Sequence, residues 1–375
     1  MNYREFNKDG ARVSLLGYGA MRFPTDENGN IDRERSKKLI DTAYAAGVNY
    51  YDTAFMYHGG KSEEFLTDAL ADYPRESYFL ADKMPVWMAK DAQDVDRIFE
   101  QQLSKCKTDY FDFYLVHAVD KNVIETFEKY GAYEKLAARK RTGQIKRLGF
   151  SFHDSVAVLE GFLDAHDWDF VQLQLNYFDW TYQHAKEQYE AVVSRGLQCI
   201  VMEPVRGGAL VSLTPQADDM LCALHPEWSI PSWAMRFAAS RENVLCVLSG
   251  MSDETALSDN IASLSDSNLM SARDEAAAFK AAQMLRDAKT VPCTGCGYCS
   301  VCPRGIAIPR LFGMYNDARI SGDRYGFYEN YKKLDVESKP FNCINCGACT
   351  DRCPQHIDVP KRLKEVRAFA EENEK

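Results

Sequence analysis

The stretches YFLADK (residues 78–83) and FDFYLVH (residues 111–117) decide the fold class of this chain. Each is a short apolar run that ends in a titratable residue, and residues 92–106 between them have the spacing of an amphipathic helix. A strand, a helix and a second strand in this order form a βαβ unit, whose two strands lie parallel. The same alternation extends in both directions from this unit.

Eight strands of this kind are predicted before the C-terminal region, with amphipathic helices between them. The strands are Leu15–Met21, Asn49–Asp52, Tyr78–Lys83, Phe111–His117, Ile145–Ser151, Phe170–Gln174, Gln198–Glu203 and Val244–Ser249. The helices include Arg33–Ala46, Lys61–Leu70, Ala92–Cys106, Asn122–Lys140, Val156–Ala165 and His184–Arg195. Eight strand–helix repeats over about 250 residues are typical of a (β/α)8 TIM barrel.

A doubly wound parallel sheet would show the same alternation of strands and helices. Its dinucleotide-binding members carry a Gly-rich fingerprint after an early strand, and Gly17-Tyr18-Gly19 alone is too weak a signal for one. The count of eight strands therefore favours the α/β barrel. Residues Ala11–Ser14 are expected to belong to a hairpin that closes the bottom of the barrel.

Charge and hydropathy limit the classes of partner. The 375 residues include 45 Lys and Arg against 55 Asp and Glu, which gives a formal net charge of −10. This negative balance argues against binding to nucleic acid or to anionic membrane surfaces. No apolar stretch approaches the ~20 residues that span a bilayer, and no cleavable apolar signal segment opens the chain. We expect a soluble, cytoplasmic protein in a reducing compartment.

Eight of the twelve cysteines form two compact motifs near the C-terminus. They are Cys293, Cys296, Cys299 and Cys302-Pro303, followed by Cys343, Cys346, Cys349 and Cys353-Pro354. The second motif has the C-x2-C-x2-C-x3-C-P spacing of bacterial ferredoxins, and the first is one residue shorter. These motifs predict two 4Fe-4S clusters.

In two-cluster ferredoxins the fourth cysteine of each motif ligates the other cluster. The expected ligand sets are therefore Cys293, Cys296, Cys299 and Cys353 for one cluster, and Cys343, Cys346, Cys349 and Cys302 for the other. Zinc is an alternative, because C-x2-C pairs also make tetrahedral sites, and disulfides are a weaker one. The scattered cysteines are expected to be small buried hydrophobes; they are Cys106, Cys199, Cys222 and Cys246.

Polar residues end three consecutive predicted strands. Asp52, Lys83 and His117 occupy these ends, and Tyr57 follows five residues after Asp52. In a TIM barrel the catalytic groups lie at the carboxyl ends of the strands. Each residue alone has a structural explanation, such as a helix cap or a buried hydrogen-bonded histidine. Together, in order on successive strand ends, they predict an active site.

The motifs that surround these residues resemble the aldo/keto reductase superfamily. They are Leu16–Arg22 (LGYGAMR), Val48–Ala54 (VNYYDTA) followed by Tyr57, Ala81-Asp82-Lys83, and Asp112–His117 (DFYLVH). Barrel and cysteine motifs together look like the aldo/keto reductases that carry a C-terminal ferredoxin domain. The resemblance implies a barrel at residues 1–289, a ferredoxin-like domain at residues 290–375, and nicotinamide-dependent carbonyl reduction. The long spacer between the motifs is similar to that of the α-helical ferredoxins, with helices expected at Ile308–Ala318, Tyr325–Leu334 and Val359–Glu372.

The chemistry of carbonyl reduction assigns a role to each catalytic candidate. Hydride addition builds negative charge on the carbonyl oxygen, which an acid must neutralise. Tyr57 is the expected acid, and the ammonium group of Lys83 is expected to lower its pKa. Asp52 would hold Lys83 charged and oriented, and His117 would donate a hydrogen bond to the carbonyl oxygen.

The resemblance also implies contacts with a nicotinamide cofactor. Ser151 and Gln172 would contact the carboxamide, and Asp259 and Asn260 would contact the adenine. The pyrophosphate would lie on the loop with Glu203, Pro204, Val205, Gly207 and Gly208. Further contacts are expected from Gly19, Ala20, Met21 and Asp52. Phe152 replaces the asparagine that the family pairs with the serine. Ser151 as a helix cap and Gln172 as a core hydrogen-bonding residue remain alternatives.

The segment after the eighth strand lacks the basic residues that the family carries there. Gly250 and Ala256 stand where NADPH-specific members carry cations, and Asp253 and Glu254 add negative charge. A 2′-phosphate would lack a bidentate partner there. NADH is therefore as plausible a donor as NADPH.

Two functions of different classes remain open. In the first, the chain is an oxidoreductase that reduces an aldehyde or ketone, and its clusters pass electrons to or from an external carrier. In the second, it is an electron-transfer or redox-sensing protein whose barrel binds nicotinamide with little carbonyl turnover. The intact set of four catalytic candidates favours the first, and the altered carboxamide contact keeps the second open.

Overall fold

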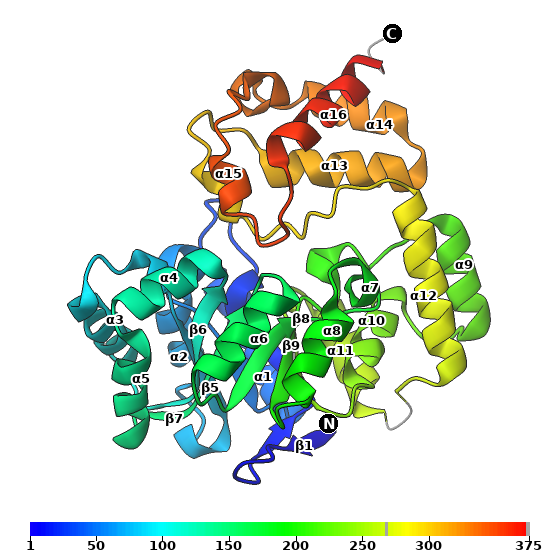
Figure 1. Cartoon of the computed structure of the whole chain (residues 1–375). Helices are drawn as coiled ribbons and strands as arrows, with labels where there is room; N and C mark the ends of the chain where they lie inside the picture. Colours follow the sequence, from blue (N-terminus) through cyan, green and yellow to red (C-terminus); the bar gives the residue numbers. More distant parts are fainter. Residues whose placement is uncertain (267–268, 373–375) are drawn as a thin grey trace. The chain divides into compact units, whose positions relative to one another are not determined.

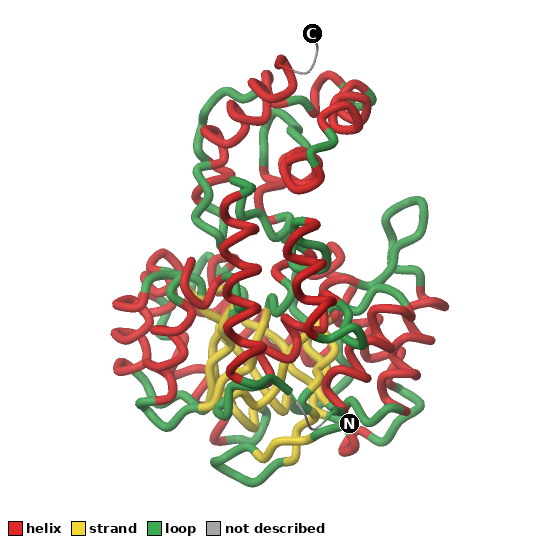
Figure 2. The backbone as a smooth tube through the Cα atoms, turned by 90° about the vertical axis from the view of Figure 1, so that its right-hand side faces the viewer, coloured by secondary structure: helices red, strands yellow, loops and turns green. Residues whose placement is uncertain are grey.

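A closed barrel of eight parallel strands forms the core of the computed structural model, which describes residues 1–266 and 269–372. The strands follow one another around the barrel in the order β3, β4, β5, β6, β7, β8, β9 and β10, and β10 pairs again with β3. Figure 2 shows them in yellow with helices around them. The predicted barrel is confirmed, and the doubly wound alternative is wrong because the last strand, β10, pairs with the first barrel strand, β3, and closes the sheet.

The strands begin and end close to the predicted positions. Their bounds are β3 Leu16–Gly19, β4 Tyr50–Asp52, β5 Phe79–Met84, β6 Phe111–Val119, β7 Ile145–Phe152, β8 Phe170–Gln174, β9 Gln198–Met202 and β10 Val244–Ser249. The chain continues from β3 into a short 3-10 helix, η1 (Ala20–Arg22), where the sequence predicted strand. Figure 1 labels most of these elements.

Helices alternate with the barrel strands. They are α1 Arg33–Ala45, α2 Ser62–Leu70, α3 Ala92–Lys105, α4 Lys121–Lys129, α5 Ala132–Arg141, α6 Val156–Ala165, α7 Asp179–Tyr182, α8 Ala185–Val193, α10 Ile230–Ala239 and α11 Glu254–Ser265. The prediction of one helix over Asn122–Lys140 is wrong. The chain turns at Gly131, whose φ of 58° lies in the left-handed region that glycine enters at little cost, and this turn separates α4 from α5.

An N-terminal hairpin carries apolar residues into the barrel core. Strands β1 (Tyr3–Glu5) and β2 (Arg12–Ser14) pair antiparallel, as expected for Ala11–Ser14. Phe6 and Val13 join a buried cluster with inward-facing residues of the barrel strands, among them Tyr50 and Phe113. The rings of Phe6 and Phe113 lie 5.9 Å apart in an edge-to-face arrangement. Because Phe113 lies near the start of β6, this packing occupies the amino end of the barrel and leaves the carboxyl ends of the strands for a site.

The chain divides into two compact units. One contains Met1–Pro204 and Met235–Met270, and the other contains Val205–Ala234 and Ser271–Lys375. In this division residues 205–234 and α12 (Ala272–Asp287) group with the C-terminal region, and the domain boundary at residue 289 stays a prediction. The reason for this grouping is local packing within the second unit. His225, which ends α9 (Pro215–Leu224), lies with its Nε2 atom 2.9 Å from Asp274 Oδ1 in α12.

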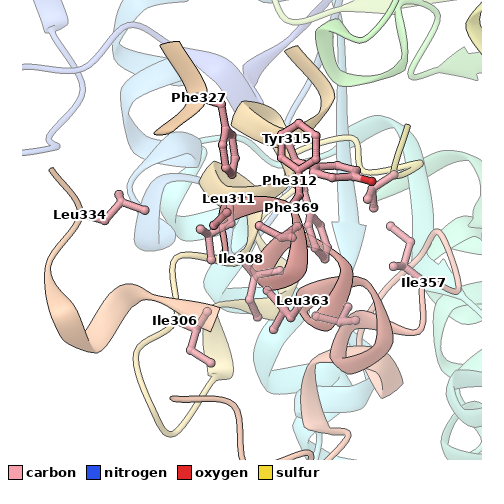
Figure 3. Close-up of a cluster of buried hydrophobic side chains, with 14 of the residues drawn as sticks. Ile306, Ile308, Leu311, Phe312, Tyr315, Phe327, Leu334, Ile357, Leu363 and Phe369 are labelled. Carbon is pink, nitrogen blue, oxygen red and sulfur yellow. The ribbon is translucent and has the colours of Figure 1, made fainter. Parts of the chain in front are cut away.

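The second unit has a hydrophobic core of its own (Figure 3). Its other helices are α13 Ile308–Ser321, α14 Arg324–Lys332, α15 Ala348–Asp351 and α16 Val359–Glu372, close to the predicted ranges. Leu311 and Phe312 of α13 pack with Leu363 and Phe369 of α16 in this core. The segment that leads into the first cysteine motif is tied to α13, because the Asn316 side chain accepts from the Val291 amide at 2.7 Å and donates to the Val291 carbonyl at 2.8 Å.

The four scattered cysteines do not all behave as predicted. Cys106, Cys199 and Cys246 are buried, as expected for small hydrophobes. Cys222 is exposed, so the prediction of burial is wrong for this residue, which lies on the outer side of α9. Within the described residues, no helix is both long and apolar enough to cross a membrane.

Candidate functional site

Four side chains meet at the carboxyl end of the barrel. Asp52 ends β4, Lys83 lies in β5, His117 lies in β6, and Tyr57 begins the 3-10 helix η2 (Tyr57–Gly60). The Lys83 Nζ atom lies 2.5 Å from Asp52 Oδ1, and the same ammonium group donates to the Thr53 carbonyl at 2.7 Å. It also lies 3.4 Å from the Tyr57 hydroxyl. The structure thus brings the predicted acid, its cationic neighbour and the carboxylate into one chain of contacts.

Aromatic rings surround the imidazole of His117. The Tyr57 ring lies 5.9 Å from it, edge to face, and the Trp87 ring lies 5.1 Å from it. Trp87 is therefore part of the site. Trp180 is not, because its ring packs against Phe237 at 5.5 Å on the helical side of the barrel. The imidazole of His117 thus has aromatic neighbours on two sides.

The protonation states follow from burial. Burial raises the pKa of Tyr57 well above its ordinary value, and the Asp52 and Glu203 carboxylates add to this, while the charge of Arg22 lowers it in part. The prediction that Lys83 produces a net lowering is therefore wrong, because burial disfavours the phenolate. A protonated phenol is the form that a proton donor needs. Burial and the Lys83 charge lower the pKa of His117 well below its usual range, so its ring is neutral at pH 7.

Three residues that the sequence analysis did not assign hold the backbone of Lys83. The Asp82 carboxylate accepts from the Lys83 amide at 2.8 Å, and the Gln102 side chain donates to the Lys83 carbonyl at 3.0 Å. The Tyr114 hydroxyl in turn donates to Gln102 at 2.5 Å. Of these three residues, only Asp82 could have been noticed in the sequence, because it is an acidic residue in a mainly apolar strand. These bonds fix the strand position from which Lys83 reaches Asp52 and Tyr57.

The two residues expected to bind a carboxamide lie side by side. Ser151 of β7 and Gln172 of β8 are direct partners in the parallel register. The Ser151 hydroxyl oxygen accepts from the Ala118 amide at 2.8 Å and keeps its own proton for donation. The Gln172 Oε1 atom is buried and has no hydrogen-bond partner among the described residues. A buried acceptor without a partner is costly, so this pair fits an amide ligand such as a nicotinamide carboxamide. Phe152, at the family's asparagine position, is buried and offers no polar group.

The loop after β9 has an unusual backbone. Glu203, Arg206, Gly207 and Gly208 all have positive φ angles, a conformation that directs successive amide groups to one side and that phosphate sites exploit. Gly207 is also pressed against the first cysteine motif, since a Cβ atom built on it would lie 1.8 Å from the Thr294 carbonyl oxygen. The loop that the resemblance assigns to a pyrophosphate therefore contacts the residue next to Cys293.

Gly207→Ala is expected to destabilise the second unit by ~1–3 kcal/mol, because an added methyl group forces the Thr294 backbone to move. Chemical denaturation followed by circular dichroism measures this change. Gly208→Ala is a matched control, because Gly208 is also left-handed but has open space around its Cβ position. Equal losses in the two variants would show that backbone strain, and not the close contact with Thr294, makes Gly207 necessary.

Asn260, one of the two residues expected to contact the adenine, has a hydrogen bond within the protein. The Asn260 side chain is buried and donates to Ser249 Oγ at 2.9 Å, and Asp253 caps α11 by accepting from the Ala256 amide. Glu254 forms ion pairs with Lys38 at 3.5 Å and Arg35 at 3.9 Å, both from α1. The Arg22 side chain packs against Gly250. Cationic side chains that are distant in sequence therefore lie at the segment after β10, where the local sequence predicted no cation.

Each cysteine motif contributes to two separate cavities. One cavity is lined by Cys293, Cys296 and Cys299 of the first motif and by Cys353 of the second. The other is lined by Cys343, Cys346 and Cys349 of the second motif and by Cys302 of the first. The structure thus groups the cysteines in the crossed arrangement that the ferredoxin-type spacing predicts.

The two halves around these cavities repeat one another. In each half the loop has left-handed residues at matching positions, Gly295 and Gly297 in the first and Asn345 and Gly347 in the second. Each motif then leads into a helix of fourteen residues with proline at its second position, α13 in the first half and α16 in the second. The repeat therefore extends beyond the cysteines, contrary to the impression from the sequence.

The alternatives to an iron–sulfur site fit the structure less well. All twelve cysteines are thiols and none is in a disulfide, so disulfides do not explain the motifs. In the described part of the chain, no group of three or more His, Cys, Asp or Glu residues is placed to hold a single metal ion, as a zinc site would require. Four thiols that line a cavity are the donor set of a cubane cluster, in which each thiolate binds a different iron.

A barrel with this constellation at its carboxyl end, joined to a two-motif cysteine domain, defines a redox protein of the reductase type. The aldo/keto reductase family model matches residues 15–277, more than half of the chain, and the chain belongs to this family. A 4Fe-4S dicluster domain model matches residues 292–357.

Relatives and solved structures agree with this assignment. The chain is 29% identical over 163 residues to the uncharacterized oxidoreductase YqkF of Bacillus subtilis (strain 168), covering 40% of this chain and 49% of that protein. It is 23% identical over 230 residues to YrpG of the same organism, covering 56% and 68%. The chain thus spans about half the length of the first relative.

One similar solved structure is that of a thermostable aldo-keto reductase, Tm1743, in complex with the inhibitor epalrestat. It aligns with a TM-score of 0.63 at 22% identity, and the alignment covers 75% of this chain and 99% of the Tm1743 chain. The holo form of aldo-keto reductase AKR11C1 from Bacillus halodurans aligns with a TM-score of 0.60 at 21% identity, over 75% and 96%. At this level of identity the likeness shows the barrel fold.

Proposed function

We propose that this protein reduces an aldehyde or ketone with a nicotinamide cofactor at the carboxyl end of its barrel. The observation that carries the proposal is the chain of contacts from Asp52 through Lys83 to the Tyr57 hydroxyl, with His117 beside the phenol. Family membership alone would not assign these roles, since function depends on the site and not on the fold.

In the proposed mechanism Tyr57 is the proton donor. Its phenol is protonated because burial raises its pKa, and Lys83 lies close enough to stabilise the negative charge that remains after the proton leaves. Asp52 holds the Lys83 ammonium group in place. The neutral His117 ring donates a hydrogen bond to the carbonyl oxygen and orients it. Ser151 and Gln172 would hold the carboxamide of a nicotinamide, and the bound cofactor would supply the hydride.

The cysteine domain is proposed to bind two 4Fe-4S clusters. Cys293, Cys296, Cys299 and Cys353 would hold one, and Cys302, Cys343, Cys346 and Cys349 the other, because these sets line separate cavities. Such clusters supply one-electron transfer. The protein's redox partners would then include a one-electron carrier in addition to the small carbonyl compound.

The experiment that tests the proposal is anaerobic turnover of a simple aldehyde with NADH and with NADPH. Alcohol formed in equal amount to the nucleotide consumed supports the reductase. Cluster reduction by nucleotide without alcohol formation would instead support the second function, an electron-transfer protein whose barrel binds nicotinamide. The buried Phe152 in place of an asparagine is the observation that favours this alternative.

Cofactor preference is expected to be weak, with Kd values for NADH and NADPH within about tenfold of each other. Glu254→Gln is expected to shift this ratio about three- to tenfold toward NADPH, because it removes a negative charge that pairs with Lys38 and Arg35. Fluorescence titration of both nucleotides measures the change, and Glu160→Gln on the exposed face of α6 is the control. A hundredfold preference of the wild type for NADPH would contradict the expectation.

A further inference from the structure

The two halves of the cysteine domain differ in exposure at equivalent positions. Thr294 and Ile344 each follow the first cysteine of a motif, but Thr294 is 2% exposed and Ile344 is 60% exposed. Cys296 is half-buried, whereas its equivalent Cys346 is exposed. The site that contains Cys346 is therefore the more open one at these two positions. At the third cysteine the order is reversed, because Cys349 is buried and Cys299 is half-buried.

The cause of the difference is the loop after β9. Gly207 approaches Thr294 so closely that a side chain on Gly207 would overlap the Thr294 carbonyl group. The cavity that contains Cys293 is also closed by Gln355 and Ile357, which are buried. At the other cavity, Ile344 and Cys346 line the wall and are open to solvent. A protein that docks on this domain can therefore contact Ile344 and Cys346 directly at the second site, whereas the equivalent Thr294 of the first site is covered by Gly207.

The open site is surrounded by apolar side chains. Ile344 and Phe341 (47% exposed) lie in the second motif and just before it, and Val301 (44% exposed) precedes Cys302. Val336, also exposed, is held near this segment because the Asn342 side chain donates to its carbonyl at 2.6 Å. Exposed apolar side chains around a functional centre are typical of a protein-binding surface. We call Val301, Arg304, Phe341, Ile344 and Cys346 the second-site face.

The two segments that supply this face have a charge balance opposite to that of the whole chain. Residues 301–310 and 332–352 contain six Lys and Arg and three Asp and Glu, whereas the chain has 45 against 55. Arg304 lines the cavity itself and is exposed. Exposed apolar side chains beside an exposed arginine, in net-positive segments of an otherwise acidic protein, are complementary to an acidic partner, and complementary charge raises association rates and selects partners.

We propose that the second-site face is the docking surface for a small acidic one-electron carrier protein. The carrier gives one electron and is oxidised, and the centre held by Cys302, Cys343, Cys346 and Cys349 takes up that electron and is reduced. No bond or proton changes are needed in this step. The inference rests on the cluster sites of the proposed function, and it adds which of the two sites exchanges electrons with the partner. Cys346 is the exposed ligand through which the partner approaches.

The test is binding of an acidic plant-type [2Fe–2S] ferredoxin to the iron-loaded protein, measured by isothermal titration calorimetry at low and high salt. We expect binding to the wild type that weakens with salt, and a Kd at least tenfold higher for Ile344→Glu. Tyr325→Glu adds the same charge at a side chain that is 75% exposed on α14 and should leave the Kd within twofold. Arg304→Glu is a second variant that keeps the apolar surface.

The outcomes separate this inference from the proposed function. Iron content and visible absorption are measured for every variant first, and a wild type without iron would contradict the cluster sites themselves. Iron-loaded wild type that does not bind the ferredoxin would overturn the docking surface. Equal Kd values for wild type, Ile344→Glu and Arg304→Glu would overturn it as well. A rise in Kd confined to these two variants supports it, and faster cluster reduction by reduced ferredoxin in the wild type than in Ile344→Glu adds kinetic support.

Discussion

Tyr57→Phe is expected to lower kcat for carbonyl reduction by about 10²–10⁴-fold, the range in which a positioned acid contributes. The phenylalanine ring can keep the edge-to-face contact with His117, so the site should hold its shape. Only the hydroxyl group 3.4 Å from the Lys83 ammonium is lost. Because binding groups stay in place, nucleotide Kd and aldehyde KM should change less than threefold. Steady-state kinetics with a simple aldehyde measures all three quantities.

A second tyrosine provides the control for this variant. Tyr130 lies outside the barrel, where its hydroxyl donates to the Lys90 carbonyl at 2.8 Å, and Tyr130→Phe should leave kcat unchanged. If Tyr57→Phe retained more than a fifth of wild-type kcat, another group would have to be the proton donor. His117 is a poor candidate for that role, because its lowered pKa leaves the ring neutral at pH 7.

The grouping of the catalytic candidates could be predicted from the sequence because strand ends are easy to recognise. Asp52, Lys83 and His117 each follow an apolar run, and parallel strands in a barrel bring such ends to one rim. The direction of the Tyr57 pKa could not be predicted. It depends on how completely the folded protein removes the phenol from water, and that is decided by residues far apart in the sequence, such as Glu203.

Contacts between distant segments account for the other differences. The sequence after β10 predicted a site without cations, yet Lys38 and Arg35 of α1 pair with Glu254 because α1 and α11 are neighbours around the closed barrel. Gly207 could be recognised as part of a glycine-rich loop, but not as the residue that covers Thr294. Local sequence patterns thus predicted the helices, the strands and the grouping of the cysteines. The charge at the segment after β10 and the exposure of Thr294 depend on packing between residues that are distant in sequence.

Paired cysteine substitutions are expected to give opposite results that depend on which residues share a cluster. Each 4Fe-4S cluster holds four irons, so a fully loaded chain contains about eight. Cys296 and Cys353 line the same cavity, and Cys296→Ala combined with Cys353→Ala should therefore leave about four irons. Cys346 lines the other cavity, so Cys346→Ala combined with Cys353→Ala should disrupt both clusters and leave almost none.

The pair of variants is decisive because ligation within each motif predicts the reverse. If Cys353 completed the site of its own motif, the Cys346 and Cys353 pair would remove one cluster, and the Cys296 and Cys353 pair would remove both. Iron analysis and low-temperature EPR of the dithionite-reduced proteins distinguish the two patterns. Cys222→Ala, at an exposed cysteine outside both motifs, should keep about eight irons and controls for the loss of any thiol. The crossed result would also tie α13 and α16 to both clusters, so that loss of either cluster should loosen the core that these helices share.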